Sequence, residues 1–417
     1  MKKIFRLGLL GLLIGFLTAC NLPSIASAPA VETPIPPIAT VTSLPPTETA
    51  VPGPAVRISK IDMLDAAQGW GWEAVAENTY RLLRTADGGK TWRDVSPQGQ
   101  APSPYSGYFL DSQNAWLPVF DSTSNAGSLL HTNDGGQSWD ALSLPQAEAA
   151  QNATYQFSTP SDGVARTVGV GAGNAYFNLF QTHDGGATWT PILITAPQPE
   201  PGLPAGTVHL CNICGDWLYY DAARSVITYG DLASDPVGVV RLAVSTDLGQ
   251  HWAQLELPLP DPKYTDGSVA PQAPLFFGAD GFLPVNIMKY GADGALAYSV
   301  LATYVTHDGG QTWSAAPAIL ENTRAMVDSV QILSMQAAIV RCGKNLCATS
   351  DGARSWTTLP ESLNFDSSAG GPDYVSQFDF VNPATGWAIA GEGTAVALWK
   401  TSDGGATWSQ IAPTLAP

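Results

Sequence analysis

Charged residues, and basic residues in particular, are scarce in this chain. Only 13% of its 417 residues are charged, and 19 Lys and Arg stand against 36 Asp and Glu, for a formal net charge of −17. Proteins that bind nucleic acids through the phosphate backbone need clustered cations. The composition therefore excludes that class, and no nucleic-acid partner is expected. With five His and no phosphate-loop or metalloprotease motif, neither a metal nor a cofactor is expected.

The composition also argues against long helices. Glycine and proline are abundant, with 41 and 33 copies, whereas coiled coils and helical bundles are poor in both. Hydrophobic residues make up 45% of the chain, which is enough to build a large core and excludes global disorder. Many turn formers, abundant aromatics and low charge favour an all-β protein outside the cytoplasm.

The N-terminus has the pattern of an export signal. Lys2, Lys3 and Arg6 precede the apolar stretch Leu7–Leu17, which is too short to span a bilayer as a helix. The sequence Leu-Thr-Ala-Cys that ends at Cys20 resembles the bacterial lipobox. We therefore expect residues 1–19 to be a lipoprotein signal peptide and Cys20 to be lipidated, on a membrane at the bacterial cell surface or in the periplasm. Ordinary secretory cleavage and an uncleaved anchor helix are the alternatives.

A proline-rich segment follows the lipidated cysteine. Nine prolines lie between positions 23 and 54, interleaved with Thr, Ala and Val. Proline fixes φ and lacks a backbone donor, so such a segment forms an extended spacer rather than part of a sheet. We interpret residues 20–55 as a tether that holds the rest of the chain away from the membrane.

An eight-residue pattern, Thr-x-Asp-Gly-Gly-x-Thr-Trp with Ser at some Thr positions, occurs seven times. It is degenerate at 245–252, where Leu248 and His251 replace Gly and Thr, and at 349–356, where Ala353 replaces Gly. A recurrence of about 50 residues is typical of propeller blades. The seven copies place their aspartates at Asp87, Asp134, Asp184, Asp247, Asp308, Asp351 and Asp403.

The pattern has the chemistry of a tight turn. The Asp side chain accepts hydrogen bonds from backbone N–H groups ahead of it, and the Gly pair supplies positive φ at little steric cost. The closing Trp is large enough to pack between neighbouring sheets. Strand-like runs stand on both sides of each copy, and two more precede it. In the last unit, residues 374–381 alternate in polarity and 386–391 follow a turn.

These units predict a seven-bladed β-propeller over residues 56–413. Each blade has four antiparallel strands, with the repeated turn between strands three and four. Because every unit begins and ends in phase, we expect the ring to close by packing of the first blade against the last. Residues 414–417 are expected to form a tail.

The repeated turn resembles the Asp-box, or BNR repeat, and the whole unit is similar to that of the photosystem II stability/assembly factor family. The resemblance covers the chain after the tether. It implies a propeller fold and a binding or assembly role, which in that family is linked to a basic surface patch. It also implies that the seven Asp residues are turn formers rather than catalysts.

Other Asp-box families are glycoside hydrolases. Sialidases clamp a substrate carboxylate with three Arg and use a Tyr nucleophile, and their Arg-Ile-Pro motif has only the echo Arg57-Ile58-Ser59 here. Xyloglucanases place two propellers around a cleft and use paired acids, whereas one propeller is predicted here. A sialidase-like or xyloglucanase-like hydrolase is therefore the alternative to a binding module.

Four cysteines remain after Cys20. Cys211 and Cys214 lie in the connection into the fourth blade, and Cys342 and Cys347 flank a predicted hairpin tip in the sixth. An even number of cysteines in an exported protein favours disulfides. Local pairing within each motif is the simplest arrangement, because blades four and six are not neighbours. A redox-active pair and a four-cysteine zinc site are the alternatives.

The longest connections between blades, at about 195–216, 258–274 and 360–373, are candidate binding loops, because function concentrates on loops held by a rigid scaffold. We predict a lipid-anchored, monomeric, non-enzymatic propeller that binds a protein or glycan. A small cation site at Asp261–Asp266 is conceivable. The polar and aromatic candidates in these loops are His209, Asp261, Tyr264, Asp266, Asp373 and Tyr374.

Overall fold

The structure is a computed structural model that describes most of the chain from residue 53 to residue 416. Its gaps are 78, 101, 103, 105–106, 122–125, 146–152, 172–173, 195–213, 225, 232–237, 323–326, 367–373 and 392–395. The predicted signal peptide, Cys20 and nearly all of the tether lie outside the described residues. Within those residues, no helix is long and apolar enough to cross a membrane.

The described strands form seven sheets, taken in chain order. Blade 1 contains β1 (Ile58–Met63), β2 (Gly69–Ala76), β3 (Thr79–Thr85) and β4 (Thr91–Asp94). Blade 2 contains β5 (Tyr108–Phe109), β6 (Ala115–Asp121), β7 (Ala126–Thr132) and β8 (Asp140–Leu142). Blade 3 contains β9 (Ala153–Phe157), β10 (Gly163–Gly171), β11 (Asn174–Thr182) and β12 (Thr190–Ile194). Blade 4 contains β13 (Cys214–Asp221), β14 (Val226–Asp231), β15 (Val239–Ser245) and β16 (Ala253–Pro258).

Blade 5 is the most elaborate. It contains β17 (Ser268–Pro271), β18 (Leu275–Phe277), β19 (Asp280–Tyr290), β20 (Leu296–Thr306), β21 (Ser314–Ala315) and β22 (Leu320–Asn322), preceded by the short 3-10 helix η1 (Pro262–Tyr264). Blade 6 contains β23 (Val327–Ile332), β24 (Ala338–Cys342), β25 (Asn345–Thr349) and β26 (Thr357–Thr358). Blade 7 contains β27 (Val375–Phe380), β28 (Gly386–Ala390), β29 (Ala397–Thr401) and β30 (Ser409–Ile411).

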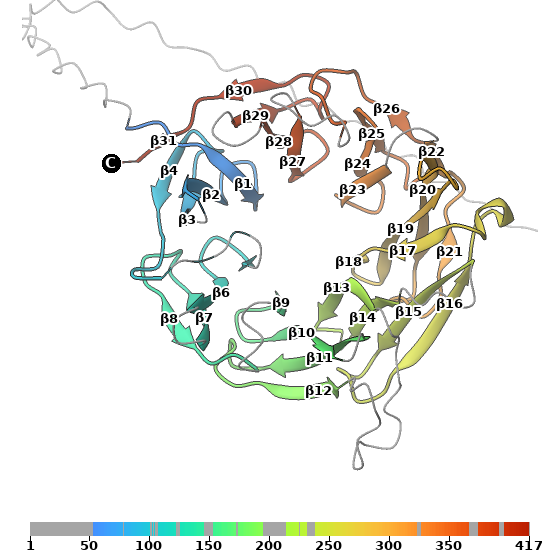
Figure 1. Cartoon of the computed structure of the whole chain (residues 1–417), viewed down its shortest axis with the longest axis horizontal. Coiled ribbons are helices and arrows are strands. Elements are labelled where there is room, and N and C mark those ends of the chain that lie inside the picture. Colours follow the sequence, from blue (N-terminus) through green and yellow to red (C-terminus); the bar gives the residue numbers. More distant parts are fainter. Residues whose placement is uncertain are drawn as a thin grey trace, which may run out of the picture. The chain divides into compact units, whose positions relative to one another are not determined.

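The predicted seven-bladed propeller with four antiparallel strands per blade is confirmed. The sheets follow one another around a ring, with the first strand of each blade toward the centre and the fourth outside (Figure 1). Blade 5 departs from the plain pattern, because β18 pairs with β19 beside β17, and β22 pairs with β20 beside β21. Each first strand is thus an open inner edge that faces a central channel.

The repeated turns join the third and fourth strands of their blades. In blade 1, Asp87 Oδ1 accepts hydrogen bonds from the backbone N–H groups of Lys90 (3.0 Å) and Thr91 (2.9 Å), and Oδ2 accepts the Thr91 hydroxyl at 2.7 Å. The Thr85 hydroxyl donates to Asp87 and accepts from Gly89 N at 3.0 Å. One carboxylate therefore satisfies the donors of the whole turn.

The two degenerate turns keep the same conformation. Leu248 and Ala353 have φ values of 57° and 60°, which is the left-handed region that Gly occupies in the other copies. The imidazole of His251 contacts Asp247 Oδ2 at 2.6 Å and takes the place of the Thr hydroxyl. The left-handed conformation costs a residue with a Cβ roughly 1–2 kcal/mol, so the surrounding hydrogen bonds must outweigh that cost.

Six of the described turns are also tied to the first hairpin of their own blade. The first Gly of the turn donates to a carbonyl in the hairpin between strands one and two: Gly88 to Ala67 at 2.7 Å, Gly185 to Ser161 at 2.9 Å, and Gly404 to Ala384 at 2.8 Å. Both turns therefore lie at the same end of the blade. We call this end of the ring the Asp-box end and the opposite end the loop end.

Tryptophans connect one blade to the next. Trp387 of blade 7 is fully buried and its indole donates to the Gly88 carbonyl of blade 1 at 3.0 Å. Trp116 of blade 2 donates in the same way to Gly185 of blade 3, at 2.8 Å, and stacks on Phe157. Apolar clusters thus fill the spaces between blades rather than one central core.

The ring is closed by a strand that the sequence analysis did not expect. Residues placed in a tail form β31 (Thr414–Leu415), which pairs in parallel with the outer strand β4 of blade 1. Leu415 N donates to Pro54 O at 2.8 Å, and Val56 N donates to Pro413 O at 3.0 Å. Closure therefore rests on hydrogen bonds as well as packing. The pairing is missed from sequence because the strand is two residues long and its partner lies at the other end of the chain.

Removal of β31 should loosen the ring. A chain that ends at Ala412 loses the four hydrogen bonds that Pro413 to Ala416 make with blade 1 and the residues before it. At about 1 kcal/mol for each net hydrogen bond, we expect a loss of roughly 2–4 kcal/mol in the free energy of unfolding by denaturant titration. A chain that lacks only Pro417 is the control, and equal stability of the two chains would contradict the closing role.

The box carboxylates should make the fold sensitive to acid. Hydrogen bonds from the Ser or Thr hydroxyl and backbone lower the pKa of Asp134, Asp184, Asp308, Asp351 and Asp403 to about 2. An acid with a lowered folded-state pKa stabilises the fold above its unfolded pKa, and this stability is lost as the pH falls through the folded pKa.

We therefore expect the melting temperature to fall between about pH 4 and pH 2. Asp403→Asn should melt lower than the wild type near neutral pH and lose less on acidification. Asp140→Asn, on the exposed end of β8, should behave as the wild type. If the melting temperatures of Asp403→Asn and the wild type change identically with pH, Asp403 does not contribute to the acid sensitivity.

Candidate functional site: the central channel

Polar side chains on the inner strands cover the open edge of the neighbouring blade. Gln377 of β27 accepts from Ile61 N at 3.0 Å and donates to Ile61 O at 2.7 Å. Asp379, two residues on, accepts from Met63 N at 2.6 Å. Both contacts lie on the inner edge of β1. Unpaired strand edges are reactive surfaces for further strand addition, so these side chains seal the junction between blades 7 and 1.

The same device recurs around the channel. Gln331 of β23 accepts from Phe380 N at 2.8 Å and donates to Phe378 O at 3.2 Å. These two hydrogen bonds join blade 6 to the inner edge of blade 7. Tyr108 of β5 donates to Phe157 O of blade 3 at 2.8 Å. These polar residues are thus already engaged with backbone, and their first role is to hold adjacent blades in register.

Asp62 of β1 is a carboxylate on an inner strand that takes no part in these contacts between blades. Asp62 is exposed at the inner edge of its strand although protein surrounds it closely, and no hydrogen bond to it is seen among the described residues. Burial by the surrounding protein and the nearby charge of Asp379 raise the pKa of Asp62 to about 7, while Lys60 opposes the shift. Burial also raises the pKa of Asp379. Two carboxylates thus share one side of the channel at its Asp-box end.

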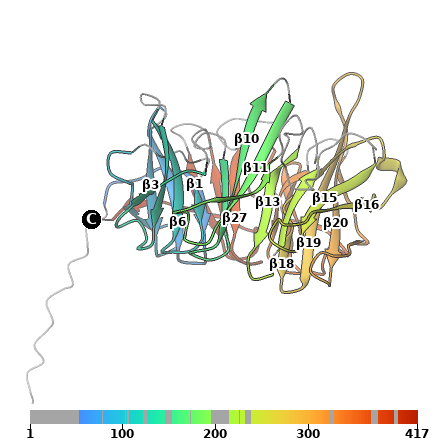
Figure 2. The ribbon, with the colours of Figure 1, turned by 90° about the horizontal axis from the view of Figure 1, so that it is seen from below.

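An uncharged cavity of about 310 Å³ lies on the other side of the channel. Its walls come from the inner parts of blades 3 to 6 and combine apolar and amide groups. They are Gln156, Tyr219, Gln272, Ala273, Pro274, Leu275, Pro284, Val330 and Ile332. Leu275 and Phe277 of β18 are 39% and 37% exposed, although both are large and apolar. Ala279, just after β18, accepts from Gly309 of the blade-5 box, so the strand that carries these two residues lies at the Asp-box end. Figure 2 labels β18 at the lower edge of the ring.

Three of the predicted loop residues come together on blade 5. Tyr264 donates to Glu321 at 2.6 Å, and Lys263 donates to the same carboxylate at 3.0 Å. Asp266 accepts from Tyr298 at 2.8 Å and pairs with Lys289. These contacts join the connection before β17 to the long β19–β20 hairpin.

Asp261 caps η1 by accepting from Lys263 N at 2.9 Å, with the lysine ammonium 3.8 Å away. The carboxylates at 261 and 266 are therefore taken by protein donors, which weakens the cation-site hypothesis. No group of three or more His, Cys, Asp or Glu able to hold a metal occurs within the described residues.

The remaining loop candidates are separate from this cluster. Tyr374 accepts from Arg341 at 2.8 Å, and Arg341 lies 3.5 Å from Asp328 on β23, at the loop end of the channel between blades 6 and 7. His209 and Asp373 lie outside the described residues.

One of the two expected disulfides is present. Cys342 and Cys347 are bonded across the β24–β25 hairpin, with 5.8 Å between their Cα atoms. Cys211 lies outside the described residues, so its pairing with Cys214 stays a prediction.

Salt bridges occupy several of the described arginines that a sialidase-like clamp would need. Four of them pair with a carboxylate of their own blade: Arg81 with Glu73, Arg224 with Asp221, Arg241 with Glu256 and Arg341 with Asp328. These pairs link neighbouring strands or turns within a sheet. They stabilise the contacts between neighbouring strands and turns, and they occupy these four guanidinium groups.

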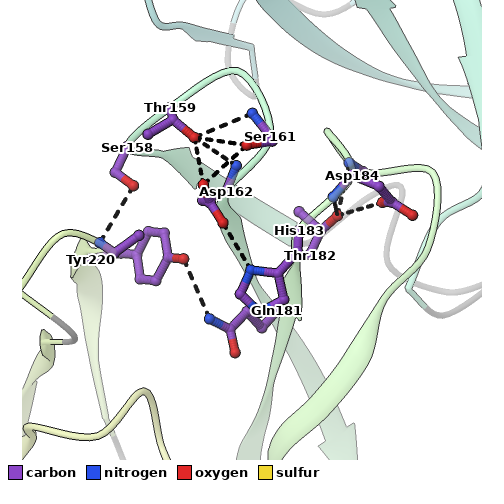
Figure 3. Close-up of polar contacts among 11 residues, drawn as sticks. Ser158, Thr159, Ser161, Asp162, Gln181, Thr182, His183, Asp184 and Tyr220 are labelled. Carbon is purple, nitrogen blue, oxygen red and sulfur yellow. Dashed lines mark hydrogen bonds and ion pairs between the residues drawn. The ribbon is translucent and has the colours of Figure 1, made fainter.

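A Ser–His–Asp arrangement in blade 3 is also structural. Asp162 receives the His183 imidazole at 2.8 Å and the Thr159 and Ser161 hydroxyls at 2.7 and 3.0 Å (Figure 3). Ser161 donates to the Asp and not to the His, so His183 is not placed to activate it. An Asp280–His307 pair, at 2.7 Å, occupies the same place in blade 5. This network ties the first turn of the blade to the Asp-box strand.

Sequence reasoning missed the channel residues, although a signal was present. Gln377 and Asp379 alternate with apolar neighbours on β27, as do Lys60 and Asp62 on β1. Alternation identifies polar positions on one face of a strand. It does not tell whether that face meets water, a ligand or the edge of the next blade.

Residues 304–315, which contain the fifth box, match the BNR/Asp-box repeat family. The chain thus carries an Asp-box repeat within a seven-bladed β-propeller. No curated protein sequence matches it. Among solved structures, YCF48 bound to D1 peptide is 16% identical, with 84% of this chain and 95% of that chain covered and a TM-score of 0.46.

Two further structures share the propeller fold. The GH74 xyloglucanase from Xanthomonas campestris is 14% identical, covering 86% of this chain and 55% of its own, with a TM-score of 0.51. A prolyl endopeptidase structure is 9% identical over 85% of this chain and 49% of its own, with a TM-score of 0.54. The Asp-box propeller therefore spans about half the length of each. At these identities the likeness shows the fold alone.

Asp62 should give the Asp-box propeller a second pH-dependent region, opposite in sign to that of the boxes. An acid whose folded pKa is raised destabilises the fold when it is ionised, so stability should rise as the pH falls from about 8 to about 4, the unfolded pKa of an Asp. Asp62→Asn removes the disfavoured charge. We expect this variant to melt above the wild type at about pH 8 and to converge with it only near pH 4. Asp140→Asn is the matched control, and a parallel pH profile for Asp62→Asn and wild type would refute the assignment.

Proposed function

We propose that this Asp-box propeller is a non-enzymatic binding module whose partner is a protein. The observation that carries the proposal is the channel cavity of about 310 Å³ with an apolar rim. None of its nine lining residues is an Asp, Glu, His, Lys, Arg, Ser or Cys. It offers no pair of carboxylates for acid–base catalysis, and its one hydroxyl group, that of Tyr219, is already engaged with Asp221 at 3.2 Å and Arg224 at 2.6 Å.

The chemistry of the cavity favours protein over glycan. Apolar pockets with a few amide groups bind apolar or aromatic side chains, which act as anchors at protein interfaces. Exposed Leu275 and Phe277 extend this surface at the rim, and adjacent exposed apolar residues mark interaction sites. A sugar would leave its hydroxyl groups facing aliphatic walls. We propose that the partner inserts one apolar side chain at the Asp-box end of the channel.

The proposed setting follows from the N-terminus. The basic residues, short apolar stretch and lipobox support export and lipidation at Cys20, with the tether carrying a monomeric propeller beside a bacterial membrane. In that setting the partner is another extracytoplasmic protein. A lipid-anchored module of this kind serves assembly or capture rather than turnover.

A glycoside hydrolase is the second candidate, because one observation favours it. Asp62 and Asp379 lie together in the channel, and the pKa of Asp62, raised to about 7, suits a general acid. Against this, Asp379 is committed to the backbone of Met63. Measurable glycan hydrolysis that disappears in Asp62→Asn would favour the enzyme over the binding module.

Site-specific photo-crosslinking in the native membrane tests the binding proposal. Replacing Phe277 by p-benzoylphenylalanine should give one discrete protein adduct. Adding Leu275→Asp should reduce that adduct by roughly tenfold, because it puts a charge in the apolar rim. Tyr290, 57% exposed at the other end of β19, is the matched control position. An adduct at position 290 with none at 277 would move the binding face to the loop end and contradict the proposal.

A further inference from the structure

A second cavity, of about 860 Å³, lies outside the channel, between blades 1 and 2. Its walls are the outer strand β4 and the segment after it, and the box turn of blade 2 with Trp139. Arg93, Gln98, Gln100 and Gln137 also line it, and all four are exposed. A volume of this size accepts a ligand of several rings. We call it the outer groove.

Arg93 is the one basic residue that lines the outer groove, and the acid next to it in the lining, Asp94, lies 3.8 Å from Arg81. Arg93 on β4 stands directly opposite Arg84 on β3, so both side chains project from the same face of the sheet, toward blade 2. Like charges at directly opposed positions destabilise a sheet. Neither arginine forms a salt bridge among the described residues, whereas four arginines elsewhere pair with carboxylates.

Arg84 is held in place by other contacts. Its guanidinium lies 5.6 Å from the centroid of the Trp70 ring and donates to Gln68 Oε1 at 3.4 Å. Burial and the charge of Arg93 lower the pKa of Arg84, while the charge of Asp111 opposes the shift. In a chain with a net charge of −17, two opposed arginines that form no salt bridge are a site for an anion.

The other walls indicate what kind of anion fits. Trp139 is half-buried, and its indole N–H donates to Val95 O at 2.9 Å, which fixes the ring at the wall of the groove. Gln98 and Gln100 present amides that both donate and accept hydrogen bonds. A flat aromatic ring with amides and a guanidinium matches a sugar that has C–H groups on one face, hydroxyls at its edge and a carboxylate.

We propose that the outer groove binds an acidic oligosaccharide, with a uronate carboxylate on Arg93 and a sugar ring on Trp139. This site is separate from the channel cavity, so it does not depend on the proposed protein partner. An acidic peptide would also satisfy the arginines. Such a peptide would make fewer hydrogen bonds with the exposed amides and would not stack on the indole of Trp139. The observations therefore favour the sugar.

Calorimetry on the full-length chain tests the proposal with three probes: tetragalacturonate, its fully methyl-esterified form and a hexaglutamate peptide. Tetragalacturonate should bind, more weakly at high ionic strength, while the ester binds at least about tenfold more weakly because it lacks the charges that pair with Arg93. Equal binding of acid and ester, no binding of the acid, or tighter binding of hexaglutamate would overturn the proposal.

Arg93→Gln locates the site. It should lose at least about tenfold in affinity for tetragalacturonate. It should also melt above the wild type without ligand, because the repulsion with Arg84 is removed. Arg354→Gln makes the same change of charge at an exposed arginine of blade 6 and should bind as the wild type. Equal affinity loss in both variants, or none in Arg93→Gln, would assign the binding to general charge or to another surface.

Discussion

The carboxylate of the Asp-box is the interaction on which the rest of this propeller depends. Within each box, one side chain receives the backbone donors of the turn and the hydroxyl or imidazole that follows it, as Asp87 and Asp247 do. The turn then holds its first Gly against the hairpin between strands one and two. A single local device thus sets the spacing of all four strands of a blade. When that spacing is fixed, the indoles of Trp387 and Trp116 can reach the box carbonyl of the next blade.

The two imperfect boxes show how strongly the carboxylate governs the turn. Leu248 and Ala353 adopt the left-handed backbone that their Gly counterparts adopt freely. In both, the initiating hydroxyl still accepts the N–H of the second turn residue: Gly249 to Ser245 at 2.7 Å and Ala353 to Thr349 at 3.0 Å. The hydrogen bonds therefore override local backbone preference. Departures from the repeat in sequence are not departures in structure here.

Local features of this protein could be read from its sequence, and non-local ones could not. The boxes, the four-strand units and the Cys342–Cys347 hairpin each lie within a few residues of chain, so spacing and turn chemistry were sufficient. The inner-edge contacts of Gln377 and Gln331, the β31–β4 pairing and the Arg84–Arg93 pair depend on which blades and strands become neighbours. The candidate cavity follows the same rule, because its walls come from four blades and no single segment carries its pattern. The loop residues chosen for their chemistry, such as Tyr264 and Asp266, bond to one another instead.

The pairing of β31 with β4 has a consequence for biosynthesis. Blade 1 is made before the other six blades, yet its outer edge is completed by residues 414–416, which follow all seven blades in the chain. Six blades can form in order behind it, while the ring stays an open arc until these residues have been made. A chain that stops before residue 414 therefore keeps an exposed strand edge on blade 1, which residues 414–416 otherwise cover.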